Sequence, residues 1–516
     1  MRRIPRATLL SICVILVVAL AVRVYLLTTP LTELEGDEAI VGLMARHILA
    51  GERPIFYYMQ PYMGSLEAYL VAGVFSLFGS STLALKLVPL LSSILFTLLI
   101  FATGLRVGGV AVAFLSGLLV AVPPAFLAIW SLKARGGYIE TLVLGQILIL
   151  LAMDVGRRGQ VALREAGAMG LLAGLGAWVN PLIVMYLLPI AVYLGLALRS
   201  RVVGRWLIVA AVGCVAGAAP LLAYNLANGF ATADLMLGGA WSPAEIPHYL
   251  RQMVRVSLPI LAGLAQASSS PTLFWPSFSV SPAGRPWVGA AVLGGFLLVA
   301  VLSARRLPDL LAGGPRAADG KNLLALLLMA APAIFLATRF RELVTEPRYL
   351  LPMYSAAPLL ALLVMRARRF WRWAPPLLAG LLLSLNLYSL ASQEPALNLP
   401  DTAPGSTAAN RAELAHFLLS HGLEKVYTDY WIAYPLAFES EERVIPSVIS
   451  GGFNRYIPYA YEVSVSPRPA FVFVAGTKEE RLFVDRLREH GVRTSAGTVS
   501  IYNVYWDLFP LDAVKP

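Results

Sequence analysis

Residues 7–40 read ATLLSICVILVVALAVRVYLLTTPLTELEGDEAI, an apolar run followed directly by an acidic stretch. The run is about 20 residues long, which is enough for a helix to cross a membrane. Four carboxylates follow it with no basic residue among them, namely Glu33, Glu35, Asp37 and Glu38. Only 14% of the chain is charged, so the stretch predicts a spanning helix that leads into an acidic loop at the membrane surface.

The composition of the whole chain is typical of a polytopic membrane protein. Of its 516 residues 58% are hydrophobic, and the mean hydropathy is +0.70, whereas about a quarter of the residues of a soluble domain are charged. The formal net charge of +11 would suggest nucleic acid as a partner of a soluble protein. Here the basic residues cluster in short loops between apolar runs, which indicates membrane topology and no nucleic acid.

Apolar runs of helical length recur up to about residue 391. Two of them are separated only by VNP (179–181) and could form one broken element. Because no small-residue cleavage site precedes the acids, we expect the first run to be an uncleaved span rather than a signal peptide. We predict about eleven spans, at residues 7–28, 82–104, 108–130, 137–153, 166–179, 181–198, 205–224, 286–303, 322–338, 349–365 and 374–391.

The basic residues give this layout one orientation. If the N-terminus is cytoplasmic, every predicted inner loop is basic, as the positive-inside rule requires. These loops carry Arg2, Arg3, Arg6, Arg106, Arg157, Arg158, Arg164, Arg199, Arg201, Arg205, Arg305, Arg306, Arg316, Lys321, Arg366, Arg368, Arg369 and Arg372. The segments expected outside the cytoplasm are 29–81, 131–136, 225–285, 339–348 and everything after about residue 392.

The outer segments have recognisable helical patterns. GDEAIVGLMARHILAGE (36–52) repeats apolar residues at helical spacing, and GSLEAYLVAGVFSLFGS (64–80) suits a helix that lies along the interface. Segment 225–285 is expected to be a large loop with a short amphipathic helix around 245–262. Together with the spans, these patterns assign residues 1–391 to one transmembrane domain.

Beyond this domain the composition changes. Residues 392–406 form a predicted linker, and 407–516 a small extracytoplasmic α/β domain, since strand-like and helix-like stretches alternate there. The helices are NRAELAHFLLSHGL (410–423) and KEERLFVDRLREHGV (478–492). The strands are KVYTDY (425–430), PAFVFVAG (469–476) and GTVSIYNVYW (497–506). The predicted fold class is therefore an α-helical polytopic membrane protein with a small C-terminal α/β domain.

A metal site made of histidine and cysteine has no support. The two cysteines, Cys13 and Cys214, lie inside apolar runs, and the five histidines are scattered. The acids of the first loop could hold Mg²⁺ or Mn²⁺ through oxygen, but we favour a protein without metal or other cofactor.

Asp37 and Glu38 have two interpretations. Acids in the first turn of a helix stabilise it by about 0.3–1 kcal/mol each, and this alone would explain one or two of them. A carboxylate at the outer membrane surface could also act as a general base and take the proton from an attacking hydroxyl. The residues alone leave both interpretations open, so Asp37 and Glu38 are candidate catalytic residues.

Cations on the predicted outer loops depart from the positive-inside pattern. They could snorkel towards the headgroups, or converge from three loops on one anion, such as a lipid phosphate, whose oxygens arginine binds in a fork. Glu140 could orient Lys133 or Arg135, and Glu346 could pair with Arg348. The candidates for phosphate binding are Lys86, Lys133, Arg135, Arg341 and Arg348, with Arg339 in the same loop.

Aromatic side chains form a third group on the outer side. Most are expected to belong to the aromatic belt at the membrane interface, while one or two could stack on a sugar ring. The aromatic candidates are Tyr57, Tyr58, Tyr62, Tyr138, Trp241 and Trp275, and Gln60 and Glu140 are polar candidates for contacts with sugar or acceptor.

An Asp-Glu pair that opens an interfacial helix after the first span, together with EPRYLLP (346–352), resembles the C-type membrane glycosyltransferases. The likeness is to the branch of protein O-mannosyltransferases and aminoarabinose transferases (glycosyltransferase family 39), over about residues 7–365. Aminoarabinose transferases carry a Lys-Pro-Pro stretch in the first loop, where this chain reads YYMQPYMGSLE (57–67) without lysine. The β-trefoil insert of eukaryotic mannosyltransferases also has no counterpart here.

The resemblance implies transfer of a sugar, with inversion, from a polyprenyl-phosphate carrier to a protein, glycan or lipid acceptor outside a prokaryotic cytoplasm. It makes Asp37 the base, Glu38 its neighbour in the motif and Arg348 a phosphate contact. Glu33 and Glu35 are then expected to be solvated loop acids. A phosphate is already a good leaving group, so one base and a cationic clamp suffice without a general acid.

Two other functions remain open. The chain could be a transporter or flippase of lipid-linked sugars, although such proteins place charges at mid-bilayer and often contain inverted repeats. It could also be a non-catalytic assembly subunit. The predicted span centres are almost free of charge, which favours chemistry at the membrane surface.

Overall fold

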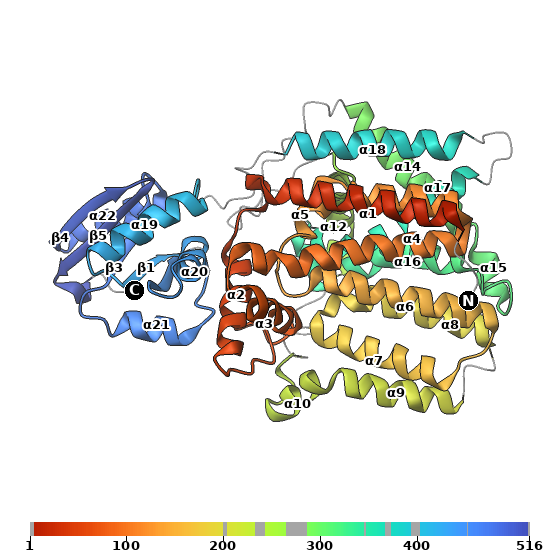
Figure 1. The fold of residues 1–516 in the computed structure, drawn as a ribbon, viewed down its shortest axis with the longest axis horizontal. Helices are drawn as coiled ribbons and strands as arrows, with labels where there is room; N and C mark the ends of the chain where they lie inside the picture. Colours follow the sequence, from red (N-terminus) through yellow and green to blue (C-terminus); the bar gives the residue numbers. More distant parts are fainter. Residues whose placement is uncertain are drawn as a thin grey trace.

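A bundle of helices carries a small sheet domain at one end, as Figure 1 shows for the computed structural model. The structure describes residues 5–199, 204–232, 243–264, 286–344, 347–366, 373–393, 403–450 and 452–513. Trp241, Trp275 and Glu346 lie outside these residues, as does the side chain of Arg339. The architecture confirms the predicted fold class of a polytopic helical protein with a C-terminal sheet domain.

Helices occupy every predicted span. They are α1 (Arg6–Leu27), α4 (Thr82–Ala121), α6 (Tyr138–Arg158), α7 (Leu163–Val179), α8 (Val184–Leu198), α9 (Arg205–Gly217), α10 (Ala219–Ala227), α14 (Pro286–Ala304), α16 (Gly320–Ala337), η7 (Pro347–Ser355), α17 (Ala357–Arg366) and α18 (Ala374–Ala391). Within the described ranges, six helices are long and apolar enough to cross a membrane, or eight if two bent pairs count as single spans. The count of about eleven stays a prediction, because two of those spans are parts of one broken helix and α7 has only 17 residues.

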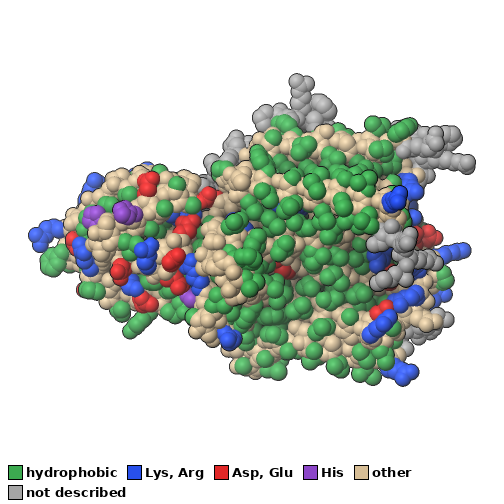
Figure 2. All heavy atoms as spheres, viewed as in Figure 1, with side chains coloured by type: hydrophobic (Ala, Val, Ile, Leu, Met, Phe, Trp, Pro, Cys, Tyr) green, Lys and Arg blue, Asp and Glu red, His purple; other side chains and the backbone are tan. Residues whose placement is uncertain are grey.

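The outer surface of the bundle is apolar, as a surface in contact with lipid must be. Large hydrophobic side chains are exposed on several helices, for example Val17 of α1, Ile208 of α9 and Leu377 of α18. Figure 2 shows hydrophobic side chains over the middle of the bundle, with Lys and Arg gathered at the end away from the sheet domain. This distribution supports a multi-pass membrane protein.

A buried arginine caps the end of α4, a helix that is kinked at Gly109, close to the predicted boundary between the spans 82–104 and 108–130. Helix α4 turns at Gly109, whose φ of 73° is the left-handed conformation that favours glycine. Arg23 of α1 is 2% exposed. Its guanidinium donates to the carbonyls of Ala121 (2.5 Å) and Val120 (3.1 Å), and its Nε donates to Ser93 Oγ (3.0 Å). Arg23 thereby caps the last turn of α4 and ties α1 to both of its halves.

Segment 29–81, which the sequence predicts to be the first outer loop and which keeps that name below, contains the two predicted helices. Helix α2 (Gly36–Leu49) begins with Asp37 and Glu38 in its first turn and ends with Arg46 and His47 in its last. These charges suit the dipole of the helix at both ends. Helix α3 (Leu66–Phe78) follows, and the segment between them is held by a bridge of Phe56 with Gly64.

The C-terminal domain is a five-stranded mixed sheet in the order β2-β1-β3-β5-β4. Strands β1 (Lys425–Asp429), β2 (Ile445–Ser450) and β3 (Ala470–Val474) are parallel. Strand β5 (Tyr502–Phe509) runs antiparallel to β3 and forms a hairpin with β4 (Arg493–Val499) at the edge of the sheet. The prediction of a single strand at 497–506 is wrong, because the chain reverses at Ser500, whose φ is 52°. The helices are α19 (Ala408–Ser420), α20 (Tyr430–Glu439), α21 (Ile457–Ser464) and α22 (Lys478–Glu489).

We predict that Arg23→Met lowers the thermal unfolding temperature of the detergent-purified protein. Each buried carbonyl that loses its donor costs about 1–3 kcal/mol. Arg6→Met is the control, since Arg6 is an exposed arginine on the same helix. Equal unfolding temperatures for the two variants would contradict the capping role of Arg23.

Candidate active site

Asp37 lies where the first outer loop meets the C-terminal domain. Its Oδ1 accepts a hydrogen bond from the Tyr430 hydroxyl at 2.5 Å and a longer one from the Tyr57 hydroxyl at 3.4 Å. The Tyr57 hydroxyl also lies 3.0 Å from the Asp37 carbonyl oxygen, which fixes the first turn of α2 against the 55–64 segment. Tyr57 was a predicted candidate, whereas Tyr430 was not.

Arg455 of the C-terminal domain completes the surroundings of Asp37. Its Nε donates to the Tyr430 hydroxyl at 3.2 Å, and its guanidinium carbon lies 5.5 Å from the centre of the Tyr57 ring. With its amide oxygen turned towards this guanidinium, Gln60 accepts from both Nη atoms at 2.7 Å. Burial and the Asp37 carboxylate raise the pKa of Tyr430 well above its usual value, so Tyr430 remains a neutral donor to that carboxylate.

Two buried ion pairs neutralise the other acids at the start of α2. Glu38 Oε1 lies 2.6 Å from Lys86 Nζ, and both side chains are almost fully buried. Glu35 pairs with Lys133 Nζ at 2.9 Å and also with Arg135. The predicted phosphate ligands Lys86, Lys133 and Arg135 therefore all contact carboxylates of the first outer loop.

The prediction that Glu33 and Glu35 are solvated loop acids is wrong. Glu35 is 5% exposed and lies between Lys133 and Arg135. Glu33 lies 3.2 Å from Arg411 Nη2 of the C-terminal domain and accepts a hydrogen bond from the Ala408 amide. Both acids are held by residues far away in the sequence, which the local pattern could not reveal.

A third buried carboxylate anchors the turn before α6. Glu67 Oε2 accepts the backbone N–H groups of Gly136 and Gly137 at 2.7 and 2.9 Å. Both glycines have a positive φ near 80°. Burial and the nearby Glu140 raise the pKa of Glu67 well above its usual value, and Glu140 accepts a hydrogen bond from Ser92 Oγ at 2.9 Å. Glu140, the acid predicted to orient Lys133 or Arg135, thus accepts a hydrogen bond from Ser92. The acid that pairs with both cations is Glu35.

Arg348 is surrounded by aromatic rings. Its guanidinium carbon lies 5.6 Å from the Trp130 ring, 5.8 Å from the Tyr138 ring and 5.6 Å from the Tyr349 ring. Such rings attract a cation and hold it in place. Arg341, by contrast, pairs with Glu245 at 3.0 Å.

Tyr62 connects the surroundings of Arg348 with those of Asp37. Burial and Tyr349 raise its pKa to about 12, against the opposing charges of Arg348 and Arg455, while Asp37 adds to the rise. The Trp130 ring gives a direct geometric link, because the guanidinium carbon of Arg135 lies 4.6 Å from its centre and that of Arg348 lies 5.6 Å from it. Arg135 pairs with Glu35, which comes two residues before Asp37. The acid and the aromatic-lined arginine therefore share one neighbourhood.

The predicted candidate Tyr58 belongs to the contact between the loop and the C-terminal domain. Its hydroxyl donates to Glu52 Oε2 at 2.6 Å and lies 2.8 Å from His47 Nδ1. His47 Nε2 in turn lies 2.7 Å from Glu442 of the C-terminal domain, and Tyr456 donates to Glu52. This network docks the domain beside the site.

Two glycines let α20 approach α2 closely. A Cβ atom at Gly36 would lie 2.8 Å from the Tyr430 ring, and one at Gly42 would lie 2.5 Å from the Phe438 ring. Figure 1 shows α20 beside α2 at the junction of the two parts. The missing side chains on α2 thus bring the Tyr430 hydroxyl within reach of Asp37.

No group of three or more His, Cys, Asp or Glu side chains is placed to hold a metal ion among the residues that the structure describes. No protein-family model and no curated protein matches the chain.

Solved structures share the fold of the chain. ArnT from Cupriavidus metallidurans bound to undecaprenyl phosphate matches with a TM-score of 0.56 at 12% identity, over 98% of this chain and 99% of that one. Its apo state gives 0.57 at 12% identity, over 98% of both chains. The apo oligosaccharyltransferase of Archaeoglobus fulgidus gives 0.52 at 15% identity, over 93% of this chain and 71% of that one. Both proteins are C-type glycosyltransferases, so the chain has the fold that the sequence resemblance implied.

We predict that Glu38→Gln destabilises the protein by about 3–5 kcal/mol, because it leaves the Lys86 ammonium buried without its partner. The double variant Glu38→Gln/Lys86→Met is expected to recover most of this loss, as measured by denaturant unfolding in detergent. Asp154→Asn, which breaks the partly exposed pair with Arg106, should cost only about 0–1 kcal/mol. If the double variant were as unstable as Glu38→Gln alone, the loss of stability would not come from an unpaired Lys86.

Proposed function

We propose that this protein is an inverting glycosyltransferase that moves a sugar from a polyprenyl-phosphate carrier to an acceptor outside the cytoplasm. The observation that carries the proposal is the shared neighbourhood of Asp37, a carboxylate at a helix start, and Arg348, a cation among aromatic side chains, which Trp130 and Arg135 connect. The fold of proteins such as ArnT, which was solved with undecaprenyl phosphate bound, supports a polyprenyl-phosphate donor.

In the proposed reaction Asp37 takes the proton of an acceptor hydroxyl as its oxygen attacks the anomeric carbon of the donor sugar. The bond between that carbon and the phosphate oxygen breaks, and the polyprenyl phosphate leaves with the electron pair. Attack and departure occur on opposite faces, so the configuration at the anomeric carbon inverts. The arginine stabilises the charge that develops on the departing phosphate.

Among the predicted phosphate ligands, we assign the phosphate contact to Arg348, which the sequence resemblance implies and whose aromatic surroundings hold its guanidinium in place. Lys86, Lys133 and Arg135 lie beside buried carboxylates that would be left unpaired if these cations turned to a ligand. We assign them the role of counter-charges that hold the first outer loop. Arg341 is engaged with Glu245 and belongs to the edge of the site.

The C-terminal domain takes part in the proposed site through Tyr430 and Arg455. The Tyr430 hydroxyl donates a hydrogen bond to Asp37 Oδ1. This bond holds the carboxylate in place, so the domain would help to orient the proposed base towards the acceptor. We assign the contact with the sugar to the aromatic side chains of this neighbourhood, namely Tyr57, which contacts Asp37, Tyr138, which contacts Arg348, and Tyr62.

The orientation of the protein follows from the distribution of charge. Lys and Arg gather at the end of the bundle opposite the C-terminal domain in the view of Figure 2. By the positive-inside rule this end would face the cytoplasm. The proposed site and the C-terminal domain would then lie on the extracytoplasmic side of a prokaryotic membrane, in the cell envelope.

We predict that Asp37→Asn lowers the rate of sugar transfer by about 10²–10⁴-fold, the usual contribution of a general base. The affinity for undecaprenyl phosphate should change by no more than about twofold, because the base does not bind the leaving group. Mass spectrometry of envelope glycans and glycoproteins from cells with the wild type, the variant or neither protein would reveal the transfer. Native mass spectrometry of the purified proteins would measure the binding.

Glu33→Gln is the matched control for Asp37→Asn and is expected to retain sugar transfer, since Glu33 is an acid of the same loop that contacts Arg411. Near wild-type glycosylation by Asp37→Asn would overturn the assignment of the base.

We predict that Arg348→Gln weakens the binding of undecaprenyl phosphate by roughly 10–100-fold, the worth of hydrogen bonds to a charged group. Arg348→Lys is expected to restore only part of this affinity, because an ammonium lacks the planar fork and the stacking of a guanidinium. Titration by native mass spectrometry measures both effects. An equal loss of affinity for undecaprenyl phosphate in Arg341→Gln would contradict the assignment of the phosphate contact to Arg348.

A further inference from the structure

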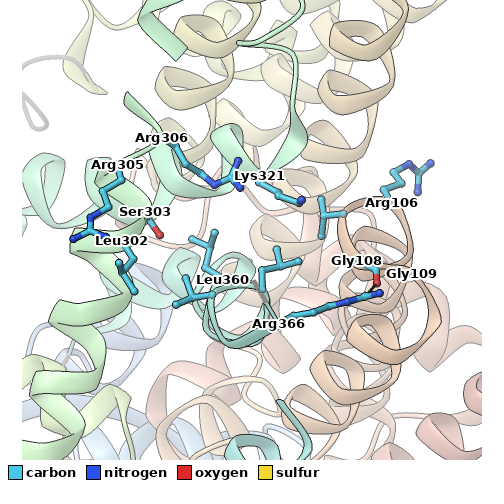
Figure 3. A pocket seen from close by; sticks show the side chains of 13 residues that line it. Arg106, Gly108, Gly109, Leu302, Ser303, Arg305, Arg306, Lys321, Leu360 and Arg366 are labelled. Atoms are coloured by element: carbon cyan, nitrogen blue, oxygen red, sulfur yellow. Dashed lines mark hydrogen bonds between the residues drawn. The ribbon is translucent and has the colours of Figure 1, made fainter. Parts of the chain in front are cut away.

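A second candidate site lies at the opposite end of the bundle. A cavity of about 900 Å³ opens between the break in α4 and helices α14, α16 and α17. Figure 3 shows the side chains that line it, which include five cations and no carboxylate, namely Arg106, Arg305, Arg306, Lys321 and Arg366. Helix α15 (Leu307–Ala312), which directly follows Arg306, lies far from the C-terminal domain in Figure 1, so this cavity is separate from the site at Asp37.

The cavity carries more positive charge than its surroundings balance. Arg106 pairs with Asp154, and Arg306 with Asp319 at 3.1 Å. Arg366 donates to the carbonyl oxygen of Gly108, which carries no formal charge. Within the described part of the chain, no hydrogen bond or ion pair engages the side chains of Arg305 and Lys321. Cations that line one cavity repel one another, and an anion bound between them offsets this repulsion.

A buried hydroxyl in the wall of the cavity also lacks a partner. Ser303 is 2% exposed, and its Oγ has no hydrogen-bond partner among the described residues. A buried polar atom is normally satisfied, and leaving it unpaired is unfavourable. Figure 3 places Ser303 in the wall of the cavity near Arg305 and Leu302. An oxygen-rich anion in the cavity would satisfy both the hydroxyl and the cations.

The remaining wall is apolar. Val107, Leu302, Leu360, Leu363 and Val364 supply it, and they come from helices whose outer surfaces would face lipid. A phosphate diester that carries acyl chains has a charged head for the cations and hydrocarbon for these side chains. A free phosphate would satisfy only the polar half of the cavity.

We propose that this cavity binds the phosphate group of an anionic membrane lipid. Arg305 and Lys321 contact the phosphate oxygens, Ser303 Oγ donates a hydrogen bond to the same group, and the acyl chains run along the apolar wall. The site is independent of the proposed sugar transfer, because none of its residues lies near Asp37 or Arg348.

Native mass spectrometry of the delipidated full chain tests the proposal, with phosphatidylglycerol as the anionic lipid and phosphatidylcholine as the zwitterionic one. We expect phosphatidylglycerol to bind more tightly, and Arg305→Gln/Lys321→Gln to weaken it by about fivefold for each cation removed. Ser303→Ala, which leaves the net charge unchanged, should weaken it by about tenfold.

Arg164→Gln/Arg205→Gln is the matched control, because it removes two cations that begin α7 and α9 outside the cavity. An equal loss of phosphatidylglycerol in this control, or equal binding of the two lipids by the wild type, would overturn the proposal. Phosphorus NMR with inorganic phosphate distinguishes the source of the anion. Binding of the free ion without binding of phosphatidylglycerol would contradict a lipid site.

Discussion

A charge buried next to a membrane needs an opposite charge beside it, and the first outer loop is organised around this requirement. Glu35 and Glu38 draw Lys86 from the start of α4, and Lys133 and Arg135 from the turn before α6, into the protein interior. Breaking such a pair leaves an uncompensated buried ion, which is far more costly than breaking an exposed one. The pairs therefore fix α2 against two helices of the bundle, and with it the position of Asp37.

Asp37, like Glu33, turns towards the C-terminal domain. Tyr430 of α20 donates to it, Arg455 of the loop before α21 donates to Tyr430, and Tyr57 reaches the acid from its own loop. Glycine at positions 36 and 42 permits this approach, because any larger side chain on that face of α2 would meet an aromatic ring. The domain is therefore part of the surroundings of the acid rather than a separate appendage.

The sequence predicted the parts of this arrangement that depend on local pattern. The apolar runs, the start of α2 and the position of Asp37 in its first turn follow from periodicity and charge within a few residues. The burial of Glu35 depends on residues about 100 positions away, and no local signal distinguishes it from a solvated acid. Tyr430 and Arg455 were missed for the same reason, since a lone tyrosine or arginine in a sheet domain carries no pattern. The hairpin at Ser500 was missed because residues 498–506, TVSIYNVYW, are mostly β-forming and only a short turn separates the two strands.

The contact between Tyr430 and Asp37 joins residues that are 393 positions apart. The ribosome therefore synthesises Asp37 long before Tyr430, and the helical bundle can enter the membrane before the C-terminal domain contacts Asp37. The surroundings of the acid are complete only when the last fifth of the chain has been synthesised and folded. A chain interrupted after α18 would keep the carboxylate and lose Tyr430 and Arg455 from its surroundings. Conversely, exchange of the final domain between homologous proteins would alter what reaches the acid without disturbing the bundle that holds it.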